Sequence, residues 1–118
     1  MIKEEIIIFG AGKRCEAIIC FYLMGNYKTE LYLCDNQKKG STITVGHNSY
    51  VVSSVEQIYS RKNDVKILIS SYANREEMIN QLKQEGACSA QIRVCEEIPS
   101  GTALFESYSR YKRGCYGK

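Results

Sequence analysis

The sequence contains little that would place the chain in a membrane or direct it across one. No apolar run approaches the roughly 20 residues that a transmembrane helix requires. The N-terminal segment carries Glu4 and Glu5 ahead of a short apolar stretch and has no small-residue cleavage site, so it is not typical of a signal peptide. These absences lead us to expect a cytoplasmic protein without a membrane span.

Histidine is nearly absent, and the cysteines lack the spacing of a metal site. The single histidine, His47, has no cysteine near it in the sequence, and no two cysteines form a C-x-x-C pair. A metal site is therefore not expected. The six cysteines are many for this length, and in a reducing cytoplasm we expect thiols rather than disulfides. Cys20, Cys34 and Cys95 lie in apolar periodic segments and are predicted to be buried.

The charge is only weakly one-sided, with 16 Lys and Arg residues, 13 Asp and Glu residues and a net charge of +3. A nucleic-acid-binding face needs a stronger patch of one sign, so no nucleic-acid partner is expected. Internal repeats and linker-like segments are also absent, and the only proline is Pro99. We therefore predict one domain over residues 1–118, with 99–118 as a C-terminal helical tail. The same pattern also fits a piece of a longer protein.

The apolar residues alternate between the patterns of strands and helices. Short apolar runs predict strands at 5–9, 30–34, 50–52, 65–70 and 90–95. Apolar residues at three- and four-residue spacing predict helices at 13–24, from 53 or 54 onward, at 74–86 and at 102–112. Residues 37–48 are predicted to form a loop or a small hairpin. Strands alternating with helices predict an α/β, Rossmann-like three-layer fold with a mainly parallel sheet of about four to five strands.

Two helix starts and one sheet edge can be predicted in more detail. Ser53 and Glu56 fit a capping box for one helix, and Asn74 with Glu77 fits a box for the next. Polar and apolar residues alternate over 90–95, which predicts a strand at an edge of the sheet.

The first strand runs directly into Gly10-Ala11-Gly12 and then into a helix. The free N–H groups and the partial positive charge at the N-terminus of a helix attract phosphate. Gly10 would form the tight turn, and Gly12 would let a phosphate approach the backbone. Cys15 stands where a dinucleotide-binding fingerprint has its third glycine. It is either a tolerated packing residue or a reactive thiol at the start of the helix.

An acidic residue follows the second strand. Asp35 lies about twenty residues beyond the glycine turn, where such a residue binds the ribose hydroxyls of a dinucleotide. A carboxylate there favours NAD over NADP. If the strand at 65–70 lies beside the first strand, residues 70–72 form the opposite lip of the site. The candidate cofactor-binding residues are Gly10, Ala11, Gly12, Lys13, Arg14, Asp35, Asn36, Ser70, Ser71 and Tyr72.

Each of these features also has a purely structural interpretation. The glycines can simply shape a turn, and Asp35 can cap one. Residues 70–72 can form an ordinary loop. Lys13 and Arg14 can be exposed to solvent rather than bound to a phosphate.

Four segments of the chain carry a resemblance to a known family: IIIFGAGKRCEAIICFYL, LYLCDNQKKG, ITVGHNSYVVSSVEQI and VKILISSYANREEMINQLKQEG. Together they resemble the Rossmann-like domain at the N-terminus of bacterial nucleotide-sugar O- and N-acyltransferases, which also occurs in cell-surface polysaccharide biosynthesis proteins. That domain holds a nucleotide or nucleotide-sugar, while a separate left-handed β-helix carries the catalysis. The resemblance implies that Gly10, Gly12 and Asp35 contact the ligand. Cys15 replaces the usual glycine, and hexapeptide repeats are absent, so acyltransferase activity does not carry over.

We therefore interpret the chain as a module that binds NAD or a nucleotide-sugar, with a second copy or a transferase domain as its partner. A small NAD-dependent oxidoreductase or epimerase-like enzyme is the alternative, using Tyr72 or the Y-x-x-x-K pair Tyr108 and Lys112. A protein-interaction module with a vestigial nucleotide site and a coenzyme A-binding domain also stay open. No nucleophile–base arrangement is identified, and His47 would be a general base only if its loop covers the cleft.

Overall fold

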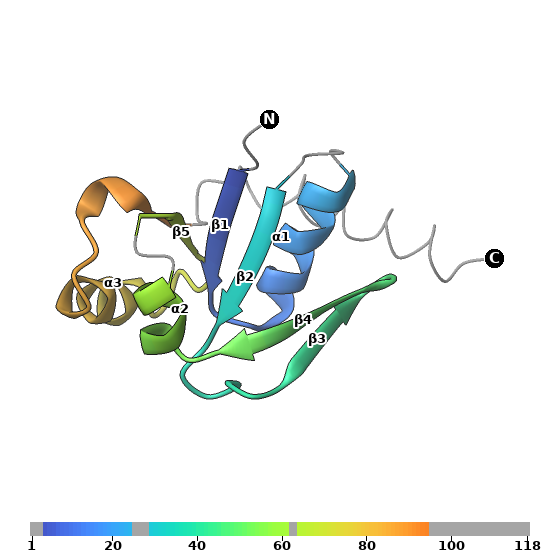
Figure 1. Cartoon of the computed structure of the whole chain (residues 1–118), viewed down its shortest axis with the longest axis horizontal. Helices are drawn as coiled ribbons and strands as arrows, with labels where there is room; N and C mark the ends of the chain where they lie inside the picture. The colour runs from blue at the N-terminus through green and yellow to red at the C-terminus, as the bar shows by residue number, and fades with distance from the viewer. Residues whose placement is uncertain (1–3, 25–28, 62–63, 95–118) are drawn as a thin grey trace.

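The structure, a computed structural model, describes residues 4–24, 29–61 and 64–94, in which strands alternate with helices apart from the consecutive strands of 29–53 (Figure 1). The strands are β1 (Glu4–Phe9), β2 (Thr29–Cys34), β3 (Thr42–Val45), β4 (Asn48–Ser53), β5 (Lys66–Ile69) and β6 (Ile92–Val94). The helices are α1 (Lys13–Met24), α2 (Val55–Arg61) and α3 (Arg75–Gln84), with a short 3₁₀ helix at Ser89–Gln91. No helix in these described ranges has the length and hydrophobicity to cross a membrane. The expected helix at 102–112, Cys95, Tyr108 and Lys112 lie outside the described residues.

The described strands form one six-stranded sheet in the order β3-β4-β2-β1-β5-β6. Neighbouring strands are parallel except β3 and β4, which form an antiparallel hairpin at one edge. The mainly parallel sheet is confirmed, and the hairpin strand β3 brings the number of strands above the predicted four to five. The predicted edge strand is also confirmed, because β6 is the last strand on the other side.

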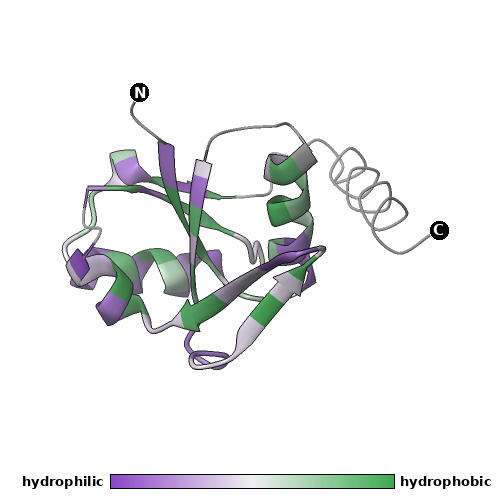
Figure 2. Cartoon of the chain, turned by 45° about the vertical axis from the view of Figure 1, so that its right-hand side comes forward, coloured by the Kyte–Doolittle hydropathy of each residue, from purple (hydrophilic) through white to green (hydrophobic). Residues whose placement is uncertain are grey.

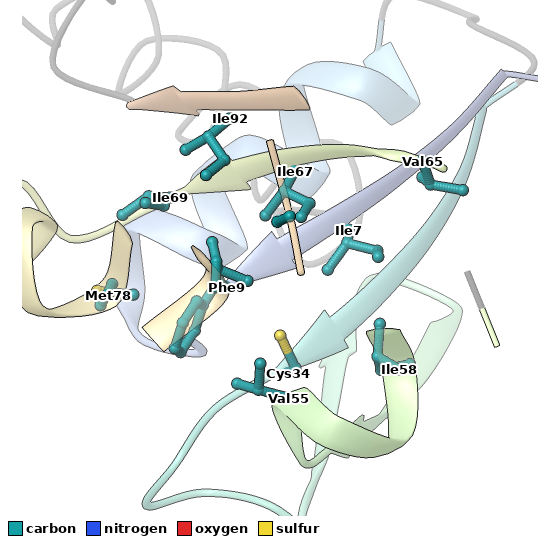
Figure 3. Packing of buried hydrophobic residues seen from close by; sticks show 12 residues of the cluster. Ile7, Phe9, Cys34, Val55, Ile58, Val65, Ile67, Ile69, Met78 and Ile92 are labelled. Carbon is teal, nitrogen blue, oxygen red and sulfur yellow. The ribbon is translucent and has the colours of Figure 1, made fainter. Parts of the chain in front are cut away.

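Helices cover both faces of the sheet, as the alternating pattern predicts. Side chains alternate between the two faces along a strand, so Ile6 and Ile8 pack in one core with α1. Ile7 and Phe9 pack in the other core, with α2 and α3 (Figure 3). Burial on both faces explains why β1 is an almost continuous apolar run after its first two residues (Figure 2).

Three of the four described cysteines are buried thiols. Cys20 and Cys34 are confirmed as buried, and Cys15 is also fully buried, in the core beneath α1. Burial, with the negative charge of Asp35 adding to it, raises the pKa of Cys34 to about 12. The Cys34 thiol is therefore protonated and unreactive at neutral pH. Cys88 is exposed.

Both predicted capping boxes are wrong in detail. At α2 the box is one residue later, because Ser54 Oγ accepts the Gln57 N–H at 3.2 Å and Gln57 Oε1 accepts the Ser54 N–H at 3.4 Å. Ser53 is instead the last residue of β4 and is held in the sheet. At α3 the cap residue is Asn74, but its side chain makes no capping hydrogen bond. Its amide donates to Ser71 Oγ at 3.4 Å instead.

Candidate functional site

The C-terminal ends of β1, β2 and β5 meet at one cleft of about 800 Å³. β1 lies between the other two strands, and the helices that follow β1 and β5 lie on opposite faces of the sheet. The Gly10 N–H donates to the Cys34 carbonyl at 2.9 Å, and the Ser70 N–H donates to the Phe9 carbonyl at 3.0 Å. These bonds hold the three strand ends together. In open parallel sheets, ligands bind at such a point of diverging connections.

The cleft brings together every candidate residue proposed from the sequence. They are Gly10, Ala11, Gly12, Lys13, Arg14, Asp35, Asn36, Ser70, Ser71 and Tyr72. Further lining residues are Phe9, Gln37, Lys38, Ala73, Asn74, Glu77, Met78 and Gln81. The three stretches of chain share one site, and their contact with a ligand stays a prediction.

The two glycines of the turn meet different requirements. Gly10 has a φ of 110°, which L side chains rarely adopt, and a Cβ there would collide with the Ser70 hydroxyl. Gly12 has no such φ, and beyond its adjoining residues no atom packs within 4 Å of the position that its Cβ would take. Gly10 is therefore needed for the fold of the turn, whereas Gly12 leaves its backbone open to the cleft.

Helix α1 begins immediately beyond this turn. The Glu16 N–H donates to the Gly12 carbonyl at 3.2 Å, which starts the helical hydrogen-bonding pattern. The first N–H groups of a helix have no acceptor within it, so they can bind an anion placed at Gly12. Lys13 and Arg14 are exposed and line the cleft beside them. Cys15 points away into the core, which supports its interpretation as a packing residue.

Asp35 binds the glycine turn through one carboxylate oxygen and the N–H groups of its own loop through the other. Oδ2 accepts the Ala11 N–H at 2.8 Å, and Oδ1 accepts the N–H groups of Gln37 and Lys38 at 2.7 and 2.9 Å. Partial burial raises the pKa of Asp35, but these three N–H groups and the Lys38 ammonium outweigh it and hold the pKa below its usual value. Each carboxylate oxygen has about two acceptor sites, so Oδ2 keeps one for a ribose hydroxyl.

Two further contacts join segments across the cleft. Lys38 Nζ donates to the Ala11 carbonyl at 3.2 Å, which places its ammonium beside the turn. The amides of Asn36 and Gln81 form a reciprocal pair, with N···O distances of 2.8 and 2.9 Å, that joins the end of β2 to α3. The sequence pattern does not identify Lys38 or Gln81 as site residues. Lys38 had one available signal, because an Asp three residues earlier often binds the N–H groups that follow it.

The opposite lip, residues 70–75, has an inner and an outer part. Ser70 is 4% exposed, and its hydroxyl lies 2.8 Å from the Gly10 carbonyl and 3.1 Å from the Phe9 carbonyl. The Ser70 hydroxyl has one proton, so it donates to one of these two carbonyls at a time. Ser70 therefore supports the glycine turn from its buried side. Ser71 is half-buried and Tyr72 is exposed. These two side chains, with the exposed Ala73 and Asn74, are the part of the lip that is open to a ligand.

Among the described residues, neither a metal site nor a histidine base is found in this cleft. No group of three or more His, Cys, Asp or Glu side chains among them is arranged to hold a metal ion. His47 is exposed in the turn between β3 and β4 and does not line the cleft, so the general-base role considered for it is not supported. Glu77 is the only carboxylate besides Asp35 among the lining residues.

Comparison with known proteins shows the fold. No family model and no curated protein matches the chain. Aspartate semialdehyde dehydrogenase II from Vibrio cholerae, in complex with ASA, matches with a TM-score of 0.57 at 16% identity, over 91% of this chain and 40% of that one. RSP, a Rex-family repressor, matches with a TM-score of 0.59 at 16% identity, over 98% and 62%. Its complex with β-NADH matches with a TM-score of 0.58 at 17% identity, over 95% and 61%.

These similarities establish a Rossmann-like fold, and no more than that follows from identities this low. The chain spans less than two thirds of each of these structures. RSP has also been crystallised with β-NAD⁺ and operator DNA. The resemblance to sugar acyltransferase domains has no counterpart among these neighbours.

Proposed function

We propose that the chain is a nucleotide-binding module whose ligand is NAD or a closely related dinucleotide. The observation that carries the proposal is the convergence of the glycine turn, the start of α1 and Asp35 at the central strand ends. A diphosphate fits against the open backbone at Gly12. A ribose hydroxyl fits the remaining acceptor site of Asp35. The complex of RSP with β-NADH supports a ligand of this class.

The charge of Asp35 selects between related ligands. Its pKa lies below the usual value, so it is ionised at neutral pH. A carboxylate beside the ribose repels a 2′-phosphate, which favours NAD over NADP.

A nucleotide-sugar is the second candidate ligand, and the resemblance to acyltransferase N-terminal domains favours it. It presents the same diphosphate and ribose to the glycine turn and Asp35, and differs in its base and its sugar. The module would then act in cytoplasmic polysaccharide or nucleotide-sugar metabolism, beside a second copy or a transferase domain. Cationic and acidic side chains both line the cleft, so neither proposal includes a nucleic-acid partner.

The test is a thermal-shift and calorimetric titration of the wild type with NAD, NADP, UDP-glucose and coenzyme A. A ligand that binds only the folded state, at a hundredfold excess over its Kd, adds about 2.7 kcal/mol to the free energy of unfolding. We expect a shift for NAD, a weaker one for NADP, and at least a tenfold loss of affinity in Gly12→Val. The valine side chain would fill the space that the phosphate needs.

The matched control is Ser54→Ala. Gly12 and Ser54 both stand at the start of a helix, and either change removes a favourable cap residue, for about 1 kcal/mol. Only Gly12 lines the cleft, so Ser54→Ala should retain the full ligand shift. If no ligand of the panel binds the wild type, the proposed function is wrong. If NAD binds and Gly12→Val leaves its affinity unchanged, the site lies elsewhere.

A further inference from the structure

The opposite lip at residues 70–75, called the second lip from here on, carries one exposed aromatic side chain in its outer part. The large hydrophobic side chains that are exposed in the described ranges are Phe21, Val51 and Tyr72. Tyr72 alone among these three lines the cleft, and 41% of its surface is exposed. Tyr72 lies two residues beyond Ser70, whose hydroxyl supports the glycine turn. Because Tyr72 is exposed and lines the cleft, its ring stands at the mouth of the cleft.

The Tyr72 ring is held in place by an arginine on its far side. The guanidinium carbon of Arg75 lies 3.7 Å from the centroid of the ring. The guanidinium also donates to the Tyr72 carbonyl at 2.8 Å, and the Arg75 N–H donates to the same oxygen at 3.2 Å. Arg75 is thus fixed to the backbone of the residue on which its side chain stacks. Such a stack needs the planar, delocalised guanidinium of arginine.

The position of Arg75 determines which face of the ring is available. Tyr72 lines the cleft and Arg75 does not, from which we infer that the guanidinium covers the face of the ring turned away from the cleft. A ring that is covered on one face and braced against rotation offers its other face as a flat, apolar platform. Nucleobases stack on such platforms whatever their sequence of donors and acceptors, because every base has a π-face.

We propose that Tyr72 stacks on the base of the bound nucleotide, with Arg75 as a positioning residue, and that the base is a purine. The purine follows from area, because two fused rings cover more of the platform than one. This inference rests on the proposed function and assigns the part of the ligand that the second lip recognises. It also gives Tyr72 a role that depends on its ring and not on its hydroxyl.

The decisive comparison uses two probes that differ only in the base. AMP and ribose 5-phosphate are titrated separately into the full chain, with Kd values from NMR chemical-shift changes. Tyr72→Ala should raise the Kd for AMP at least tenfold and change the Kd for ribose 5-phosphate by less than twofold. Tyr72→Phe keeps the ring and should rescue AMP binding. Phe21→Ala removes a ring of nearly the same exposure, 42%, outside the cleft, and should leave both Kd values unchanged.

The outcomes separate this inference from the proposed function. If neither AMP nor NAD binds the wild type, the proposed function fails and this inference fails with it. If AMP binds and Tyr72→Ala leaves its Kd unchanged, only the stacking role is wrong. If Tyr72→Phe weakens AMP as much as Tyr72→Ala does, the hydroxyl makes the contact and stacking is overturned. UMP binding as tightly as AMP overturns the preference for a purine.

A double-mutant cycle between Arg75 and Tyr72 tests the positioning role of Arg75. Arg75→Ala should weaken AMP about two- to fivefold in the wild type and have no effect in the Tyr72→Ala background. Arg75→Lys keeps the charge but not the planar group, so it should not restore AMP binding. If Arg75→Ala weakens ribose 5-phosphate as much as AMP, the arginine acts through its charge on the phosphate, and the positioning role is wrong.

Discussion

The two lips of the cleft follow adjacent parallel strands, yet they are built in different ways. The lip at residues 9–14 presents open backbone at its glycine turn, and the carboxylate of Asp35, which follows β2, binds the N–H of Ala11 there. The lip at residues 70–75 carries side chains, with an aromatic ring and a guanidinium stacked on it. A backbone lip suits the phosphate and ribose that all nucleotides share. A side-chain lip suits the base, which differs between nucleotides.

The lips are also joined at one residue. Ser70 belongs to the second lip by position, but its hydroxyl lies against the carbonyls of Phe9 and Gly10 in the first. Beyond Ser70 the second lip continues into α3, which is held to the end of β2 by the exposed Asn36–Gln81 amide pair. We therefore expect substitutions in the first lip to change the stability of the fold more than substitutions in the second.

The largest effect is expected for Gly10→Ala. The positive φ of residue 10 strains an L residue by about 1–3 kcal/mol. The collision of its Cβ with the Ser70 hydroxyl adds overpacking, typically about 1–3 kcal/mol. Gly12→Ala has neither problem and should lose about 1 kcal/mol or less. Urea unfolding of both variants measures the difference, and equal losses would show that the two glycines do not have the distinct roles described above.

The second largest effect is expected for Asp35→Asn. An amide oxygen cannot replace a carboxylate that accepts three N–H groups, and hydrogen bonds to a charged group are each worth about 1.5–3 kcal/mol. Solvent screens this half-exposed side chain, so we expect a loss of about 2 kcal/mol at pH 7. The same change should weaken the binding of NAD and reduce the difference in affinity between NAD and NADP.

The loss at Asp35 should depend on pH with a defined sign. The folded-state pKa is lowered, so the carboxylate stabilises the fold fully above its unfolded pKa of about 4. That contribution is lost as the pH falls through the lower, folded-state pKa. Melting curves of the wild type and Asp35→Asn should therefore converge below about pH 4. A difference in Tm between the wild type and Asp35→Asn that stays constant from pH 7 to pH 3 would show that the charge of Asp35 does not stabilise the turn.

The sequence predicts the first lip better than the second, for physical reasons. A tight turn between a strand and a helix demands glycine, and an acidic residue after the next strand is recognisable by its spacing. The second lip depends on contacts that no local pattern reports. Gln81 meets Asn36 across 45 residues, and the stack of Arg75 on Tyr72 follows from one side-chain rotamer.

Helix starts show the same limit on a smaller scale. The sequence predicts a capping box from Ser53 to Glu56, whereas the structure forms one from Ser54 to Gln57. The sheet decides between them, because the carbonyl of Ser53 accepts the Asp35 N–H at 3.1 Å. This bond keeps Ser53 in β4 and starts α2 one residue later. A long-range contact thus fixed a boundary that local pattern left open.

Ser70→Ala tests the link between the lips and should have a smaller effect. Removing a buried hydroxyl that donates one hydrogen bond loses about 1 kcal/mol. The same change removes the atom that a Cβ at position 10 would meet, and the remaining contacts, with Met78 Cε at 3.5 Å and the Cβ of residue 70 at 3.6 Å, are ordinary. Gly10→Ala should therefore lose less stability in the Ser70→Ala background than in the wild type. Additive losses in a double-mutant cycle would show that the two lips are independent.

The smallest effect is expected for Gln81→Ala. The amide pair of Gln81 and Asn36 is solvent-exposed, and water replaces both hydrogen bonds when one partner is removed. Changes of this kind usually alter the free energy of unfolding by about 0.5 kcal/mol or less. Asn36→Ala should have an effect of the same size, and the double variant should lose no more than either single one, because both remove the same pair. Urea unfolding of the three variants provides the measurement. A loss near 2 kcal/mol would mean that the second lip is anchored as firmly as the first, and the contrast between a fixed backbone lip and a loosely held side-chain lip would then be wrong.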